Sequence, residues 1–264
     1  TADRPCPFRC PHCTGALFPV GGGVGCELGH RFDRAAEGYL HLLPAGRRKG
    51  SAPGDSAEMI RARREFLDRG HYRPVIDDIK LAEDVGFSFA ALFDSPYNFM
   101  DMYPVFGVAA EETSRIHLGP LVTNPLTRHP SVTASTMATL QVMSEGRAFL
   151  GIGRGDSSVK MLGWKPATWK SYEKSLVDMR AWMAGEPVEV EGAPGPLVLP
   201  WAKDIPKVPL DLGLFGPRGA GVAGRLGDIG TTECAELGAV EWMIGNVRDA
   251  AAEAGREVQF EVSI

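Results

Sequence analysis

The sequence of 264 residues lacks long apolar runs, an opening leader of basic then apolar residues, and cysteines outside its first part. No apolar run approaches the ~20 residues of a membrane-spanning helix, which argues against a membrane protein. Four of the five cysteines lie within the first 26 residues, so a disulfide network across the whole chain is not expected. Cys234 stands alone and is interpreted as a buried apolar residue. The sequence therefore predicts a soluble, globular, cytoplasmic protein.

Charge is distributed unevenly along the chain. Residues 1–75 contain 12 Lys and Arg against 8 Asp and Glu, whereas residues 76–264 contain 16 against 25, which gives the net charge of −5. A basic amino-terminal part therefore precedes an acidic remainder.

The amino-terminal part contains the ligand spacing of a zinc site. Two cysteines separated by two residues are followed, after twelve residues, by a Cys-x3-His pair: Cys10, Cys13, Cys26 and His30. Three thiolates and one imidazole are a common tetrahedral set for zinc. Four protein ligands leave no open coordination position, so a structural zinc is favoured over a catalytic one. Cys6 and His12 are spare candidates, of which Cys6 could replace one ligand.

Several motifs after the cysteines resemble the amino-terminal zinc module of the 23S rRNA guanine methyltransferases. They include Arg31-Phe32-Asp33, Glu37-Gly38-Tyr39, Leu42-Leu43-Pro44, Pro53-Gly54-Asp55-Ser56, Ala62 to Leu67 and Gly70-His71-Tyr72. The resemblance covers residues 10–79, and a helix is predicted over residues 57–68. It implies rRNA recognition, with phosphate contacts from Arg47, Arg48, Lys49, Arg61, Arg63 and Arg64. A solvated basic surface is the alternative interpretation of these cations.

From residue 76 onward, predicted helices and strands alternate, which indicates a β/α architecture. Helices are expected near residues 79–85, 103–113, 132–143, 172–183 and 240–254. Strands are expected at 89–93, 116–122, 148–152, 210–215, from 227 and at 258–264. Polar residues follow four of the strands: Asp94-Ser95, Thr123-Asn124, Gly153 to Ser157 and Gly216 to Arg218. In a parallel β/α barrel these ends share one rim, so a ligand site is predicted there.

The stretch from Phe149 to Ser158 changes abruptly from apolar residues to glycines, an arginine, an aspartate and two serines. Glycines allow backbone N–H groups to approach an anion, and serine hydroxyls add donors. A tight strand-to-helix turn capped by Asp156 or Ser157 is the alternative interpretation.

The same series of motifs resembles the luciferase-like flavin and deazaflavin oxidoreductases, which are TIM barrels. The motifs on which the resemblance rests include Val122-Thr123-Asn124-Pro125, Thr127-Arg128-His129-Pro130, Ser144-Glu145-Gly146-Arg147 and Gly151 to Ser157. The resemblance points to the branch that uses coenzyme F420 more than to the FMN monooxygenases. It implies hydride transfer between F420, or a flavin, and a small organic substrate.

This resemblance also implies roles for individual residues. The strand with Thr123 and Asn124 would bulge, in some members through a non-proline cis peptide, and support the cofactor ring. The phosphate would be held by Gly153, Arg154, Gly155, Asp156 and Ser157, and Asp94 would lie near the reacting carbon. For Arg128 and His129, helix capping and substrate contact are both open.

We expect three parts: a zinc module at 1–46, a basic linker and helix at 47–78, and a β/α barrel at 79–264. The first and last strands of the barrel are not found in the sequence, which would leave six strands with two open edges. A partner chain, as in a homo-oligomer, could supply the rest. A natural fusion, a fragment and an artificial join all fit this arrangement.

A methyltransferase is the alternative function. Gly151-Ile152-Gly153-Arg154-Gly155 imitates the D-x-G-x-G loop that binds S-adenosylmethionine, but Gly151 stands where that loop has an aspartate. The oxidoreductase is therefore the favoured interpretation.

Overall fold

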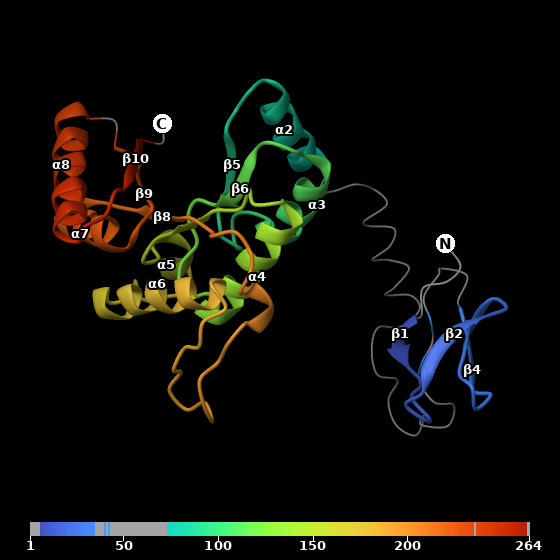
Figure 1. The fold of residues 1–264 in the computed structure, drawn as a ribbon. Helices are drawn as coiled ribbons and strands as arrows, with labels where there is room; N and C mark the ends of the chain where they lie inside the picture. Colours follow the sequence, from blue (N-terminus) through green and yellow to red (C-terminus); the bar gives the residue numbers. More distant parts are fainter. Residues whose placement is uncertain (1–5, 35–39, 41, 43–72, 235, 263–264) are drawn as a thin grey trace. The chain divides into compact units, whose positions relative to one another are not determined.

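The computed structural model describes residues 6–34, 40, 42, 73–234 and 236–262 (Figure 1). The chain divides into two compact units, residues 1–68, here called the head, and residues 69–264, here called the body. The helix predicted over residues 57–68 and the cations Arg47, Arg48 and Lys49 lie outside the described residues.

The head contains a small antiparallel sheet. Its strands β1 (Cys6–Arg9), β2 (Ala16–Val20), β3 (Gly23–Gly25) and β4 (Arg31–Asp33) pair in chain order. Gly21 has a φ of 58° in the turn between β2 and β3, a conformation that glycine adopts without steric cost. The hydrophobic cluster described here has four buried residues, Cys10, Leu17, Val24 and Phe32. A core of this size needs help from a metal or a disulfide to hold a domain.

The described residues of the body form six parallel strands. They are β5 (Phe89–Leu92), β6 (His117–Pro120), β7 (Leu150–Ile152), β8 (Leu210–Gly213), β9 (Ile229–Thr232) and β10 (Gln259–Val262). Strands β5 and β6 form one hydrogen-bonded sheet, and β7, β8, β9 and β10 form a second. Parallel bridges Leu118–Ala148 and Thr123–Ile152 join β6 to β7 and so connect the two sheets. Spatial order therefore follows chain order, as in a β/α barrel.

Helices alternate with these strands, and several of the helices begin at a capping residue. They are α2 (Arg73–Asp84), α3 (Met102–Glu112), α4 (Pro130–Met143), α5 (Ser157–Met161), α6 (Trp169–Met183), the 3-10 turn η1 (Pro200–Ala202), α7 (Gly216–Leu226) and α8 (Leu237–Glu253). Asp101, Thr168 and Glu236 accept hydrogen bonds from free backbone N–H groups at the starts of α3, α6 and α8. Figure 1 shows α7 and α8 beside β8, β9 and β10.

The main core lies between the strands and the helices. Leu118, Leu150, Ile152 and Leu210 are at most 1% exposed and belong to one cluster with helical residues such as Phe106. Because side chains alternate along a strand, the intervening residues face the barrel interior.

Two glycines permit the close approach of β6 and β7. A Cβ atom at Gly119 would lie 2.0 Å from the Phe149 carbonyl oxygen, and one at Gly151 would lie 2.0 Å from the Pro120 carbonyl oxygen. Any larger residue would push the two strands apart. Gly151 is therefore explained by strand packing, which is a further difference from the methyltransferase loop.

The β/α barrel predicted from the sequence is confirmed, and the helices and strands predicted from residue 79 onward are found with shifted ends. Helix α2 begins at Arg73 instead of residue 79, because Pro74 suits the first turn of a helix and Arg73 pairs with Asp77 at 2.8 Å. Among the described residues, β5 pairs only with β6 and β10 only with β9. No helix in the described ranges is long and apolar enough to cross a membrane.

Candidate functional site: a pocket at the strand ends and a zinc centre

The carboxyl ends of the body strands surround a pocket of ≈ 730 Å³. All eight residues predicted for the catalytic and cofactor roles line it: Asp94, Thr123, Asn124, Gly153, Arg154, Gly155, Asp156 and Ser157. They come from the ends of three strands, β5, β6 and β7. The structure therefore brings the predicted residues together in one cavity, and their chemical roles stay predictions.

Asp94 and Thr123 are directly linked across the pocket wall. The Thr123 hydroxyl donates a hydrogen bond of 2.6 Å to Oδ2 of Asp94. Behind them, burial raises the pKa of Tyr103 to about 12, and the charge of Asp94 adds to the effect. Tyr103 therefore stays neutral at physiological pH and adds no second negative charge beside Asp94.

The backbone between β6 and Thr123 has an unusual geometry. The Leu121–Val122 peptide bond is cis, at the position where the luciferase-like resemblance implies a bulge. Val122 lies close to two glycines, because Cβ atoms at Gly153 and Gly213 would be 3.3 Å and 3.1 Å from its methyl groups. Glycines directly after β7 and at the end of β8 thus leave room for the Val122 side chain at the pocket.

Asn124 is buried and organises the loop that follows it. Its Oδ1 accepts hydrogen bonds from the backbone N–H groups of Leu126 and Thr127, both at 3.0 Å. Its Nδ2 donates to the Ser158 hydroxyl at 3.4 Å. The side chain therefore joins the loop after β6 to the start of α5, while its edge lines the pocket.

The glycine-rich stretch after β7 forms a loop that turns into α5. Gly155 has a φ of 91°, and a Cβ atom there would lie 2.5 Å from a methyl group of Val159. Asp156 precedes the helix but makes no capping hydrogen bond with its side chain, and forms an ion pair with Lys160 instead. The stretch starts a helix, as the turn interpretation expects, and its residues line the cavity, while anion binding stays a prediction.

Arg154 is held on the pocket wall by an aromatic residue that the sequence analysis did not select. Its Nε donates to the Ala167 carbonyl oxygen at 2.8 Å, and its guanidinium lies 4.2 Å from the ring centroid of Trp169. Tyr172 also lines the pocket, and its hydroxyl donates to the Ile152 carbonyl oxygen at 2.8 Å. The spacing Trp-x-x-Tyr at the start of a helix after the glycine loop could have indicated both residues.

Arg128 and His129 do not line the pocket. Nδ1 of His129 accepts from the Ser131 backbone N–H at 3.3 Å and caps α4. Arg128 forms a 2.6 Å ion pair with Asp101 and lies 4.4 Å from the Tyr103 ring centroid. The capping interpretation holds for His129, and Arg128 supports the wall of the site from outside.

A buried carboxylate on β8 was also missed by the sequence analysis. Asp211 is 3% exposed, and its Oδ1 has no hydrogen-bond partner among the described residues. Strand alternation places it on the same inner side as Gly213, one step below the pocket wall. Burial raises the pKa of Asp211 to about 6, and the charge of Glu261 adds to the effect.

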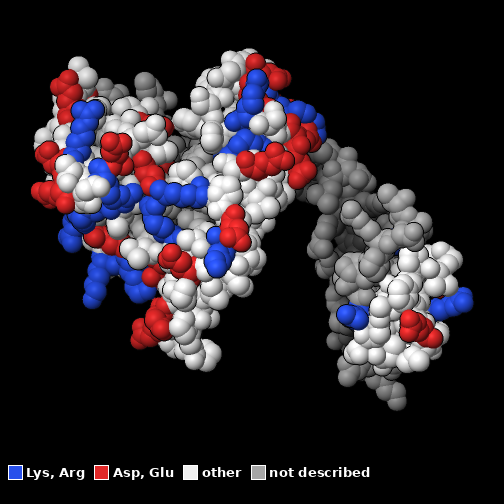
Figure 2. All heavy atoms as spheres, viewed as in Figure 1, with Lys and Arg blue, Asp and Glu red and all other residues white. Residues whose placement is uncertain are grey.

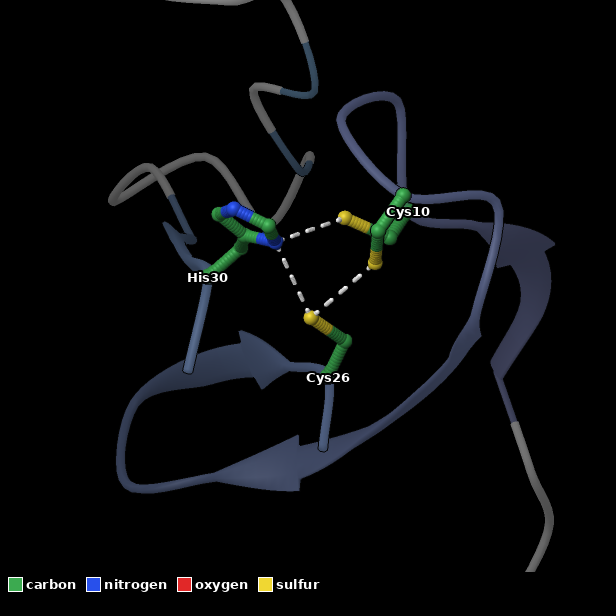
Figure 3. Close-up of side chains that lie close together, drawn as sticks. Cys10, Cys26 and His30 are labelled. Carbon is green, nitrogen blue, oxygen red and sulfur yellow. Dashed lines mark hydrogen bonds between the residues drawn. The ribbon is translucent and has the colours of Figure 1, made fainter. Parts of the chain in front are cut away.

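The predicted zinc ligands converge in the head (Figure 3). The ligand atoms of Cys10, Cys13, Cys26 and His30 all lie within 4.8 Å of one another. Nδ1 of His30 is 3.3 Å from Sγ of Cys26 and 3.6 Å from Sγ of Cys10. Three thiols and one imidazole nitrogen at these separations fit a tetrahedral zinc ion, with small adjustments of the side chains.

Of the two spare candidates, His12 does not join this group. The His12 ring stacks on the His30 ring at 4.9 Å between centroids, so it packs against a ligand instead of binding. The side chain of Cys6 lies outside the described atoms. Four protein ligands close the coordination sphere, as a structural zinc requires.

Positive and negative side chains are mixed on the viewed face of the body. Figure 2 shows Lys and Arg interspersed with Asp and Glu over the viewed face of the body. A continuous basic stripe, the usual sign of a nucleic-acid surface, is not seen on that face.

Comparisons with known proteins match both units. Residues 47–264 match the family model described as luciferase-like monooxygenase, and residues 8–51 match the amino-terminal zinc ribbon of RlmA. The 5,10-methylenetetrahydromethanopterin reductase of Methanopyrus kandleri is 33% identical over 205 residues, which are 68% of this chain and 57% of that protein. The chain therefore spans less than two thirds of that relative.

Two further matches complete the comparison. The solved structure of the coenzyme F420 dependent tetrahydromethanopterin reductase from Methanopyrus kandleri has 29% identity and a TM-score of 0.62, covering 72% of this chain and 61% of that chain. The 23S rRNA (guanine(748)-N(1))-methyltransferase of Streptomyces fradiae is 42% identical over 70 residues, 26% of this chain and 24% of that protein.

Proposed function

Because this chain belongs to the luciferase-like monooxygenase family over residues 47–264, we propose that it binds coenzyme F420 and transfers a hydride between it and a small organic substrate. FMN is the alternative cofactor. A similar solved reductase is described as coenzyme F420 dependent, which favours the deazaflavin. The cofactor supplies the hydride chemistry, and the protein supplies binding and orientation.

The observation that carries this proposal is the convergence of eight predicted residues on one pocket. Its volume of ≈ 730 Å³ lies within the range of cofactor and ligand sites, roughly 300–1,000 Å³. The residues come from neighbouring strand ends, which is where β/α barrels place their sites.

The two ends of the pocket suit different parts of a phosphorylated cofactor. The loop from Gly153 to Ser157 offers backbone N–H groups, a hydroxyl and the Arg154 guanidinium, which are ligands for a phosphate. On the other side, Thr123 fixes the Asp94 carboxylate by its 2.6 Å hydrogen bond. We assign Asp94 the task of accepting the substrate proton as general base, or of returning it in the reverse direction.

The test is a fluorescence titration of the purified protein with F420 and, separately, with FMN. Replacement of Arg154 by Gln should weaken binding by about tenfold, because a charge-assisted bond to phosphate is lost. Arg225→Gln is the matched control, since Arg225 pairs with Glu173 on the surface at 3.0 Å. Absence of binding for both cofactors contradicts the proposal.

The head supports a second function, the binding of rRNA. It is supported by the 42% identity over 70 residues to an rRNA methyltransferase. Simultaneous replacement of Arg47, Arg48 and Lys49 by Gln should weaken binding to an rRNA hairpin and lower its salt dependence, because fewer phosphates are neutralised. The matched control replaces three exposed lysines of the body, Lys165, Lys170 and Lys174. Equal loss in both triple variants would mean that no specific site exists in the head.

A further inference from the structure

Two aromatic side chains form one wall of the pocket beside Asp94. Phe93 and Phe99 line the cavity, each is 54% exposed, and their rings stack at 5.5 Å with an angle of 29°. An exposed pair of phenyl rings loses the stabilisation that burial would give it. A pair that stays exposed at a cavity is typical of a surface that a ligand covers.

Further large side chains are exposed in the loop after β5 and around the end of α5. Tyr97, Met100, Met161 and Trp164 are between 43% and 58% exposed. Nδ2 of Asn98 lies 3.7 Å from Sδ of Met161, so the loop after β5 contacts α5. We call Phe93, Tyr97, Phe99, Met100, Met161 and Trp164 the aromatic rim. Phe93 and Phe99 of the rim line the pocket beside Asp94, and Met161 is the last residue of α5.

The cations at the pocket lie toward its phosphate end, where Arg218 also lies 5.4 Å from the ring centroid of Trp169. Among the described residues that line the pocket, only Arg154 and Lys160 are cationic. Lys160 pairs with Asp156, and Arg154 is bound to Ala167 and stacked on Trp169 at the phosphate end. Outside the pocket, Arg128 pairs with Asp101. Asp94 is itself negative, so a phosphate or carboxylate on the substrate would meet repulsion there.

From these contacts we infer that the substrate is an uncharged aromatic or alicyclic molecule that stacks on Phe93 and Phe99 with its reacting carbon toward Asp94. The inference rests on the proposed oxidoreductase function and adds the substrate class. Ring faces supply area and stacking, while the charge of Asp94 and the lack of any cationic residue in the aromatic rim itself disfavour anionic competitors.

Two probes of the same shape test the charge preference. Naphthalene-2-methanol is neutral and 2-naphthoate is anionic, and the binding of each to the full chain is followed by saturation-transfer NMR. We expect the neutral probe to bind about tenfold more tightly, because a carboxylate near Asp94 would meet the repulsion of a largely solvent-screened like charge. Equal or tighter binding of 2-naphthoate would overturn the inference.

Variants locate the probe. Phe99→Ala should weaken binding of naphthalene-2-methanol by about two- to tenfold, the range of an aromatic pair. Phe87→Ala is the matched control, because Phe87 is 65% exposed and precedes β5, at the opposite end of the strand from the pocket. Thermal unfolding of both variants shows that they fold. An unchanged affinity in folded Phe99→Ala rejects the assignment of the rim.

The result is separable from the cofactor proposal. If the protein binds F420 in the fluorescence titration but shows no preference for the neutral probe, the substrate class alone is wrong. If the neutral probe binds at the rim but neither F420 nor FMN binds, the oxidoreductase function is wrong and the rim remains a ligand site.

Discussion

The Thr123 hydroxyl donates a 2.6 Å hydrogen bond to Oδ2 of Asp94 and thereby joins the carboxyl ends of β6 and β5. Thr123 is 1% exposed, so this donor is not exchanged for water. A carboxylate held by a buried donor keeps one orientation, which a reacting group needs. The bond therefore connects the sheet directly to the proposed chemistry.

Thr123→Val should lower the rate of hydride transfer about tenfold or more, because Asp94 loses its fixed orientation. The free energy of unfolding should fall by only about 1 kcal/mol, the net worth of a hydrogen bond. Thr136→Val is the control, since that hydroxyl bonds to the Val132 carbonyl oxygen on α4. Single-turnover kinetics and urea denaturation measure the two quantities. An unchanged rate in Thr123→Val would remove Asp94 from the proposed mechanism.

Gly155, in the loop before α5, and Gly163, after α5, both have positive φ. Comparing their replacements separates the effect of backbone strain from the effect of steric crowding. Gly155→Ala should reduce the free energy of unfolding by about 2 kcal/mol or more, because a Cβ would lie 2.5 Å from Val159. Gly163 has a φ of 74°, but a Cβ atom there would meet nothing within 4 Å. Gly163→Ala should therefore reduce the free energy of unfolding by only about 1 kcal/mol. F420 titrations should show weakened affinity for Gly155→Ala alone. Equal affinities in the two variants would place the phosphate elsewhere.

Cys26→Ser should abolish zinc binding, because the thiolate contributes one of four ligands. Cys234→Ser is the control, since Cys234 packs against the body core far along the sequence from the zinc ligands. Elemental analysis gives the zinc content of each variant. All five tryptophans, Trp164, Trp169, Trp182, Trp201 and Trp242, lie in the body, so tryptophan fluorescence follows that unit alone. We expect the fluorescence-detected unfolding of the body to be unchanged; retention of zinc in Cys26→Ser would exclude Cys26 as a ligand.

The parts of the site that the sequence predicted depend on local rules. Tetrahedral zinc needs short spacings on turns, and Cys10, Cys13, Cys26 and His30 have them. Parallel strands end on one rim, which placed Asp94, Thr123 and the glycine loop together. The spacing along the chain brings the zinc ligands together, and the order of the strands brings the strand-end residues together.

The missed residues depend on how distant elements pack. The Trp-x-x-Tyr spacing could have selected Trp169, but its contact with Arg154 arises only because α6 lies against the loop after β7. Asp211 stood inside a predicted strand, and an acidic residue between two leucines could have been read as inward-facing. The function of a polar position inside a barrel depends on the other strands, which a single segment does not reveal.

Asp211 leads to a prediction about pH. Burial raises its pKa to about 6 in the folded protein, above the ordinary value of 3.8. The folded state therefore holds this proton more tightly than the unfolded state does. Its contribution to stability is complete below about pH 4 and is lost as pH rises through 6. A difference of about two pKa units corresponds to about 3 kcal/mol by pH 7.

Asp211→Asn should remove this pH dependence, because the amide has the same shape and no charge. The variant should be more stable than the parent at pH 8 and nearly equal to it at pH 4.5, measured by urea denaturation with tryptophan fluorescence. Asp228→Asn is the opposite control. Burial works against ionisation of Asp228, yet the Leu210 N–H, Lys207 and Arg180 hold its pKa below the ordinary value. Its replacement should therefore destabilise the body at pH 8, and equal behaviour of the two variants would mean that Asp211 has a cationic partner in solution.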